Sequence, residues 1–186
     1  MYVYTYKNKM KAWFDECKLM RGKTMHDIKV EIILFKGKQN ISWKDVELYI
    51  KRYQGKSFII EKYNDQIILN YEFIREFAGS RYTRNLRGAL AKVKANISQI
   101  IPDLICKADN RRWIENKAEK HVNQADGGWY RYDVHFSFPV QIENNPIKRW
   151  NDYCATLVVK INRRGLYLYD IINIKKEARN PGGSKN

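Results

Sequence analysis

Residues 129–138, WYRYDVHFSF, alternate between two sets of side chains. Counting in twos from Tyr130 gives an aromatic and apolar set, whereas the other set includes Arg131, Asp133 and His135. A period of two is that of a β-strand, whose successive side chains point to opposite faces of its sheet. The pattern therefore predicts a strand with one face in the core and one polar face.

Two further strands are expected downstream, at residues 153–162 and 166–175, joined by a tight turn at residues 163–165. A fourth strand near residues 141–150 stays an open alternative. These strands predict an antiparallel sheet of at least three members.

Helical spacing of apolar residues precedes these strands. One helix is expected from residue 81 to about 101, where Pro102 ends it, and another from Asp109, its expected N-cap, to about His121. Packed helices followed by an antiparallel sheet define an α+β fold.

The first 70 residues predict a smaller α/β unit without obvious chemistry. We expect a helix within residues 2–25, a strand at 28–35, a helix that Ser42 caps and Gly55 ends, and a hairpin around Asn64.

The chain is strongly basic, with 35 Lys and Arg against 20 Asp and Glu and a formal net charge of +15. Such a charge attracts phosphate backbones, because bound cations release the counterions condensed on a nucleic acid. We expect a nucleic-acid partner, RNA in particular; an anionic membrane surface and simple surface charge are the alternatives. No apolar run approaches the roughly 18 residues that span a bilayer, and residues 1–14 lack a signal-peptide core.

Three widely separated cysteines, Cys17, Cys106 and Cys154, argue against a disulfide framework and against a CxxC zinc site. A soluble, cytoplasmic protein is expected. The sequence contains no Gly-rich phosphate loop, GxSxG or HExxH motif, which disfavours an NTPase, a serine hydrolase and a zinc enzyme. We therefore expect no cofactor and no metal.

One group of candidate residues is cationic and follows Gly79. Five Arg or Lys residues and no acid occur between Gly79 and Asp103. Because Leu90 and Val93 mark an apolar side of the same helix, its opposite side is expected to bind nucleic acid. The predicted nucleic-acid-binding residues are Arg81, Arg84, Arg87, Lys92 and Lys94, with Arg111 and Arg112 from the next helix.

A second group fits acid–base chemistry. Metal-free RNA cleavage needs a base for the 2′-hydroxyl, an acid for the leaving 5′-oxygen and cations for the transition state. His121 fits the acid or the base, and Lys117 and Arg131 fit the cations. Thr156 and Tyr169 complete the predicted catalytic set from the neighbouring strands.

These residues also have purely structural interpretations. His121 fits the C-terminal end of a helix, where the dipole favours a cation, and Lys117 fits an ion-paired, solvated helix face. Asp133 fits a charge cluster with Arg131 and His135, and the aromatic set of the same strand fits the core.

Several motifs carry a resemblance to a known family. They are GSRYT at 79–83, AKxKAN at 91–96, RWxENKxEKH at 112–121, GWYRYDxxFxxPV at 128–140, ATLVV at 155–159 and LYLYDI at 166–171. Through them, residues 55–177 resemble a domain of phage and conjugative-element polyvalent proteins that is similar to barnase, EndoU, colicin and RelE-like nucleases.

The resemblance implies packed helices before a four-stranded antiparallel sheet, and RNA cleavage without a metal. It carries over five residues that fit the helix-His and sheet-face pattern of that group: His121, Lys117, Arg131, Thr156 and Tyr169.

On this basis we divide the chain into an N-terminal accessory α/β region (1–54), a nuclease-like domain (55–177) and a disordered tail (178–186). The expected function is a metal-independent ribonuclease or toxin-type effector of a phage or mobile element, with an immunity or host protein as a second partner. The alternative is a non-catalytic module that binds nucleic acid or interacts with a host defence.

Overall fold

The structure is a computed structural model that describes residues 28–37, 40–116, 127–140 and 149–178. Its helices are α2 (Trp43–Ile50), α3 (Tyr71–Gly79), α4 (Arg81–Asn85), α5 (Gly88–Ile97) and α6 (Ile101–Cys106), with a 3-10 turn at Lys51–Tyr53. Its strands are β1 (Ser57–Ile60), β2 (Asp65–Ile68), β3 (Asp109–Ile114), β4 (Trp129–Val140), β5 (Arg149–Asn162) and β6 (Gly165–Lys176).

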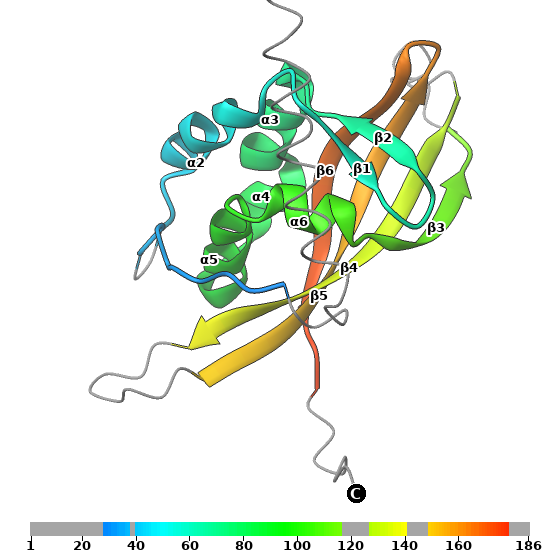
Figure 1. The fold of residues 1–186 in the computed structure, drawn as a ribbon. Coiled ribbons are helices and arrows are strands. Elements are labelled where there is room, and N and C mark those ends of the chain that lie inside the picture. The colour runs from blue at the N-terminus through cyan, green and yellow to red at the C-terminus, as the bar shows by residue number, and fades with distance from the viewer. Residues whose placement is uncertain (1–27, 38–39, 117–126, 141–148, 179–186) are drawn as a thin grey trace, which may run out of the picture.

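All six strands belong to one sheet, in the order β1-β2-β6-β5-β4-β3 (Figure 1). Neighbouring strands are antiparallel except β2 and β6, which run parallel. The expected α+β fold is confirmed. The strands from β3 to β6 form an antiparallel sheet of four members. The strand that the sequence left open near residues 141–150 is not this fourth member: residues 141–148 lie outside the described residues, and residues 149–150 begin β5.

The alternation of residues 129–138 is confirmed in β4. Tyr132 and Val134 are buried, whereas Arg131 and Asp133 are half-buried on the opposite face. Residues directly opposite each other in antiparallel strands share a face. The register therefore extends the core face of β4 onto β5, and the predicted strands and tight turn of residues 153–175 are confirmed.

The helices gather on one side of the sheet (Figure 1), where one hydrophobic core joins them to the strands. Val46 of α2 and Phe73 of α3 belong to this core, as do Ile28 and Val30 before the first helix. The described residues before position 55 thus share a core with the rest of the chain. The helix expected in residues 2–25 and the tail from residue 179 lie outside the described residues.

Local signals placed some of the helix ends and one turn. Ser42 caps α2, accepting a hydrogen bond from the Asp45 N–H, and the hairpin turns at Asn64, whose φ is 55°. Pro102 lies in the first turn of α6. Backbone N–H groups of a first turn make no hydrogen bond within the helix, so proline, which has no N–H, is tolerated there. The predictions for Ser42 and Asn64 are confirmed. Pro102 does not end the preceding helix, which stops at Ile97, but the break near Pro102 and a second helix beginning there are observed.

The single helix expected from residue 81 is instead two helices, α4 and α5. Between them Arg87 is extended and Gly88 has φ +56°, a left-handed conformation that glycine adopts without strain. The break places Arg81 and Arg84 on α4 and Lys92 and Lys94 on α5.

Residues 28–35 do not form the expected strand. Within the described residues their one ladder contact is the bridge between Lys29 and Ser137. Asn96 of α5 binds this segment instead: its Oδ1 accepts from the Leu34 N–H at 2.7 Å and the Phe35 N–H at 3.1 Å, and its Nδ2 donates to the Phe35 carbonyl. A helix side chain thus satisfies peptide groups that a strand neighbour would otherwise pair.

The helix expected from Asp109 is also wrong over residues 109–114, which form β3 and pair with β4. Asp109 does not act as an N-cap but accepts hydrogen bonds from Lys62 at 2.6 Å and from the Tyr63 hydroxyl at 2.9 Å. Asn110 has φ 52°, which interrupts any helix there. Tertiary pairing with the β1–β2 hairpin and with β4 overrides the helical spacing.

The carboxylate of Asp109 is expected to contribute to stability in a pH-dependent manner. Its hydrogen bonds with Lys62, the Asn110 N–H and Tyr63 lower its pKa from 3.8 to about 2. A depressed pKa in the folded state gives stability above the unfolded pKa, and this stability is lost as the pH falls through the folded pKa. Urea unfolding should find Asp109→Asn less stable than wild type at neutral pH, with the difference shrinking between about pH 4 and pH 2. A constant difference across that window would contradict this role.

Candidate functional site

The polar face of the sheet gathers most of the chemistry-bearing side chains. Register places Arg131 opposite Val158, Asp133 opposite Thr156 and His135 opposite Cys154, so the members of each pair lie on the face opposite to that of Tyr132 and Val134. Val158 and Thr156 are nonetheless buried. We call this surface the polar face and define it by residues Arg112, Trp129, Arg131, Asp133, His135, Cys154, Thr156, Lys160 and Tyr169.

His135 forms the first of two pairs on this face that join a side chain to a carboxylate. Its Nδ1 lies 2.8 Å from Oε1 of Glu177, the residue that follows β6. A carboxylate only accepts, so Nδ1 carries the hydrogen and Nε2 becomes the nitrogen through which a proton can pass. Burial raises the pKa of the neighbouring Cys154 thiol, and the Glu177 charge adds to that effect, so the thiol stays protonated at neutral pH.

Asp133 and Arg112 form the second pair. Arg112 donates to both carboxylate oxygens of Asp133, one of them at 2.6 Å, and Asn110 donates to it as well. The hydrogen bonds from Arg112 lower the pKa of Asp133, so this carboxylate stays ionised and cannot serve as a proton donor. Arg131 and Thr156 lie beside this pair, one along β4 and one across on β5.

An aromatic cluster occupies the far end of the polar face. The rings of Trp129 and Tyr169 meet edge to face with centroids 5.0 Å apart. Lys160, directly opposite Trp129, pairs with Glu72 of α3. Burial raises the pKa of Tyr169 to about 12, with the nearby acids of α3 adding to the effect, so its hydroxyl stays protonated.

The structure brings three of the five predicted catalytic residues onto one face: Arg131, Thr156 and Tyr169. His135 is six positions from Trp129 along β4, a distance of roughly 20 Å. Tyr169, which contacts Trp129, therefore lies apart from the His135–Glu177 pair. His121 and Lys117 lie outside the described residues. Glu177 and Glu72 are additional residues of the site that the sequence analysis did not predict. Each pairs with a residue far away along the chain, Glu177 with His135 and Glu72 with Lys160, and no local sequence pattern predicts such pairs.

The predicted nucleic-acid-binding residues fall into two groups. Arg81, Arg84 and Arg87 are exposed, and within the described part of the chain none of them pairs with a carboxylate. Arg84 and Arg87 donate to backbone carbonyls around α4. Lys92 on α5 is half-buried.

The prediction that Lys94 binds nucleic acid is wrong, because its side chain is 0% exposed and is paired with Asp170. Arg111 and Arg112 are exposed on β3 rather than on a helix, and carboxylates neutralise both: Asp65 pairs with Arg111 at 3.0 Å, and Asp133 pairs with Arg112. The Asp65 carboxylate also accepts from the Tyr132 hydroxyl at 2.7 Å, which ties the β1–β2 hairpin to β3 and β4.

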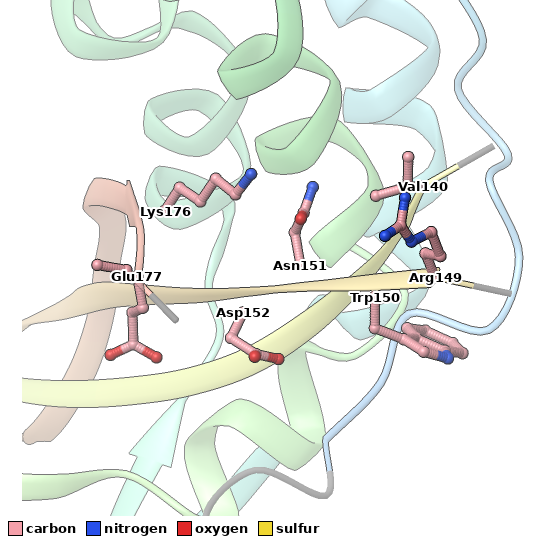
Figure 2. A pocket seen from close by; sticks show the side chains of 8 residues that line it. Val140, Arg149, Trp150, Asn151, Asp152, Lys176 and Glu177 are labelled. Atoms are coloured by element: carbon pink, nitrogen blue, oxygen red, sulfur yellow. The ribbon is translucent and has the colours of Figure 1, made fainter. Parts of the chain in front are cut away.

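A pocket of about 620 Å³ lies where β5 begins and β6 ends. Its walls include Arg149, Asn151, Asp152, Lys176 and Glu177 (Figure 2). Glu177 belongs to this wall and to the His135 pair, so the pocket borders the polar face.

Among the residues that the structure describes, no group of three or more His, Cys, Asp or Glu side chains could hold a metal ion. None of the described helices is both long and apolar enough to cross a membrane. Comparison with known proteins finds no matching family model, no similar curated protein and no similar solved structure.

Proposed function

We propose that the chain is a metal-independent ribonuclease of a phage or mobile element, and that it cuts RNA on the polar face. One observation carries this proposal: the His135–Glu177 pair lies on the same face as Arg131, Thr156 and the Arg112–Asp133 pair. The resemblance of residues 55–177 to polyvalent-protein nuclease domains supports it.

The proposed reaction is transfer to the 2′-oxygen. A base removes the 2′-hydroxyl proton, the 2′-oxygen bonds to phosphorus, the bond from phosphorus to the 5′-oxygen breaks, and an acid protonates that oxygen. The products are a 2′,3′-cyclic phosphate and a 5′-hydroxyl. Imidazole suits either proton transfer because it changes charge near neutral pH.

We assign one proton transfer to His135, with Glu177 holding the ring in the required tautomer. Arg131 stabilises the charge that builds on the phosphate oxygens. Thr156, of which only 8% is exposed, stays a candidate hydrogen-bond donor to them. His121 and Lys117 stay candidates for the second proton transfer and for further charge stabilisation.

The aromatic cluster is suited to stacking against an RNA base rather than to binding a phosphate. Trp129 and Tyr169 offer ring surface on which a neighbouring base can stack. Glu72 neutralises Lys160 there, so this end of the face offers little attraction to a phosphate. The basic charge of the chain brings RNA to the surface, as a cytoplasmic toxin-type effector would require.

The test uses purified protein, total RNA and tRNA in the presence of EDTA. The proposal predicts discrete fragments with cyclic phosphate and 5′-hydroxyl ends, because proton transfer by side chains needs no metal. Cleavage that stops in EDTA, or fragments with 5′-phosphate ends, would contradict it.

A non-catalytic nucleic-acid-binding module is the second candidate. The charges of Arg81, Arg84 and Arg87, which no described carboxylate neutralises, favour it because exposed arginines attract phosphates. Tight, salt-sensitive RNA binding without fragments in the same assay would support this candidate and reject the nuclease.

A further inference from the structure

The pocket at the end of β5 and β6 lies outside the groups assigned to proton transfer. Figure 2 shows Lys176, Asn151 and Arg149 extending from one side of the strands, whereas Asp152 and Glu177 extend from the other. The strands thus separate a cationic side of the pocket from an acidic side.

The positive charges on the cationic side are available to bind an anionic ligand. Arg149 and Lys176 are exposed, and no carboxylate among the described residues pairs with either. The two acids of the wall already have partners: Asp152 accepts from the Ser137 hydroxyl at 2.7 Å, and Glu177 binds His135.

We propose that the cationic side binds a phosphate of the RNA strand that flanks the scissile bond, an inference that rests on the proposed function. A guanidinium, an ammonium and an amide N–H are all donors that suit phosphate oxygens. Trp150 is a poorer surface for a base, because Lys29 already lies 5.4 Å from the centre of its ring.

The chain path connects this phosphate to the His135 pair. Lys176 and Glu177 are consecutive and point to opposite sides of the strands (Figure 2). The last register pair of β6 is Lys176 with Tyr153, so residues 149–152 of β5 project beyond it. A single strand of RNA that passes around this narrow end meets the cationic side and then His135.

The test measures binding of a fluorescein-labelled 2′-O-methyl RNA, which lacks the nucleophilic hydroxyl, at increasing KCl. For a single strand, each phosphate that the protein no longer neutralises makes the slope of log affinity against log salt shallower by about 0.7. The double variant Arg149→Gln/Lys176→Gln should therefore lose this one phosphate contact and show a slope shallower by about 0.7.

The matched control is Arg163→Gln/Arg164→Gln, which removes the same charge at the turn between β5 and β6. This turn lies roughly 40 Å along the strands from Arg149, so the control should keep the wild-type slope. If both variants changed the slope equally, the effect would come from net charge alone, and the pocket assignment would be overturned. An unchanged slope in both variants, or no RNA binding by wild type, would overturn it as well.

The two proposals fail separately. A slope change confined to the Arg149/Lys176 variant, in a protein that leaves unmodified RNA intact, would retain the phosphate site and reject the nuclease. Cleavage of RNA by wild type together with an unchanged slope would retain the nuclease and reject the phosphate site.

Discussion

Replacing Lys94 with methionine is expected to lower the free energy of unfolding by about 3–5 kcal/mol, although the two side chains have similar length. The Lys94 ammonium lies 2.7 Å from Oδ1 of Asp170, and the two residues are 0% and 3% exposed. The substitution leaves a carboxylate in the interior without its counter-charge. Such removal of one partner costs much more than the pair itself contributes.

The residues around this pair keep water away from it, so water cannot solvate the Asp170 carboxylate that Lys94→Met leaves without a partner. The Lys94 ammonium lies 4.9 Å from the ring centre of Phe77 and 4.8 Å from that of Tyr82. Asp170 also accepts from the Ser80 hydroxyl at 2.9 Å, which joins α4 to β6. Burial lowers the pKa of Lys94 and raises that of Asp170, because each charge alone is disfavoured in the interior.

Urea unfolding followed by circular dichroism measures this effect. Lys92→Met is the matched control on the same helix, and it should change stability by less than about 1 kcal/mol because Lys92 is only half-buried. Lys94→Met/Asp170→Leu should recover most of the loss, since both charges leave the interior together. A loss below about 1 kcal/mol for Lys94→Met would show that the pair does not hold α5 against β6.

Replacing His135 with alanine is expected to reduce RNA cleavage by about 10²–10⁴-fold, the usual contribution of a general acid or base. Stability should change little, because the side chain is half-buried on the polar face rather than in the core. Initial rates of RNA cleavage in EDTA, with urea unfolding alongside, check both expectations.

Two further variants separate catalysis from position. Glu177→Gln retains a hydrogen-bond acceptor but loses the charge that steadies the imidazole, so it should give a smaller loss of rate than His135→Ala. His121→Ala tests whether the second proton transfer belongs to that residue. Full activity in His135→Ala with none in His121→Ala would move the reaction away from the polar face.

The long strands and some of the helix ends were predictable because their signals are local, whereas α3 was not predicted and α4 and α5 were expected as one helix. The alternation of residues 129–138 needs only one buried face, and Ser42 and Pro102 act within a single helical turn. Residues 28–35 and 109–114 failed because distant partners decide their structure. Asn96 binds the first segment, and pairing with β4 holds the second.

The same distinction applies to the site. Period two placed Arg131, Asp133 and His135 on one face, but Glu177 reaches His135 from 42 positions away along the chain. Charge counts treated Lys94 as a surface cation, yet its partner Asp170 lies 76 positions away. Composition therefore indicates how many cations a chain carries, whereas only the fold shows which of them remain available to a ligand.

The central claim is that a ribose 2′-oxygen attacks phosphorus under the control of His135. The most direct measurement maps a cleavage site in a defined RNA and then repeats the assay in EDTA with a single 2′-deoxy nucleotide placed on the 5′ side of that bond. The account predicts that this one substitution stops cleavage at that bond by wild type, and that His135→Ala leaves the all-ribose substrate nearly intact. Continued cleavage of the deoxy-substituted bond, or equal rates for wild type and His135→Ala, would contradict it.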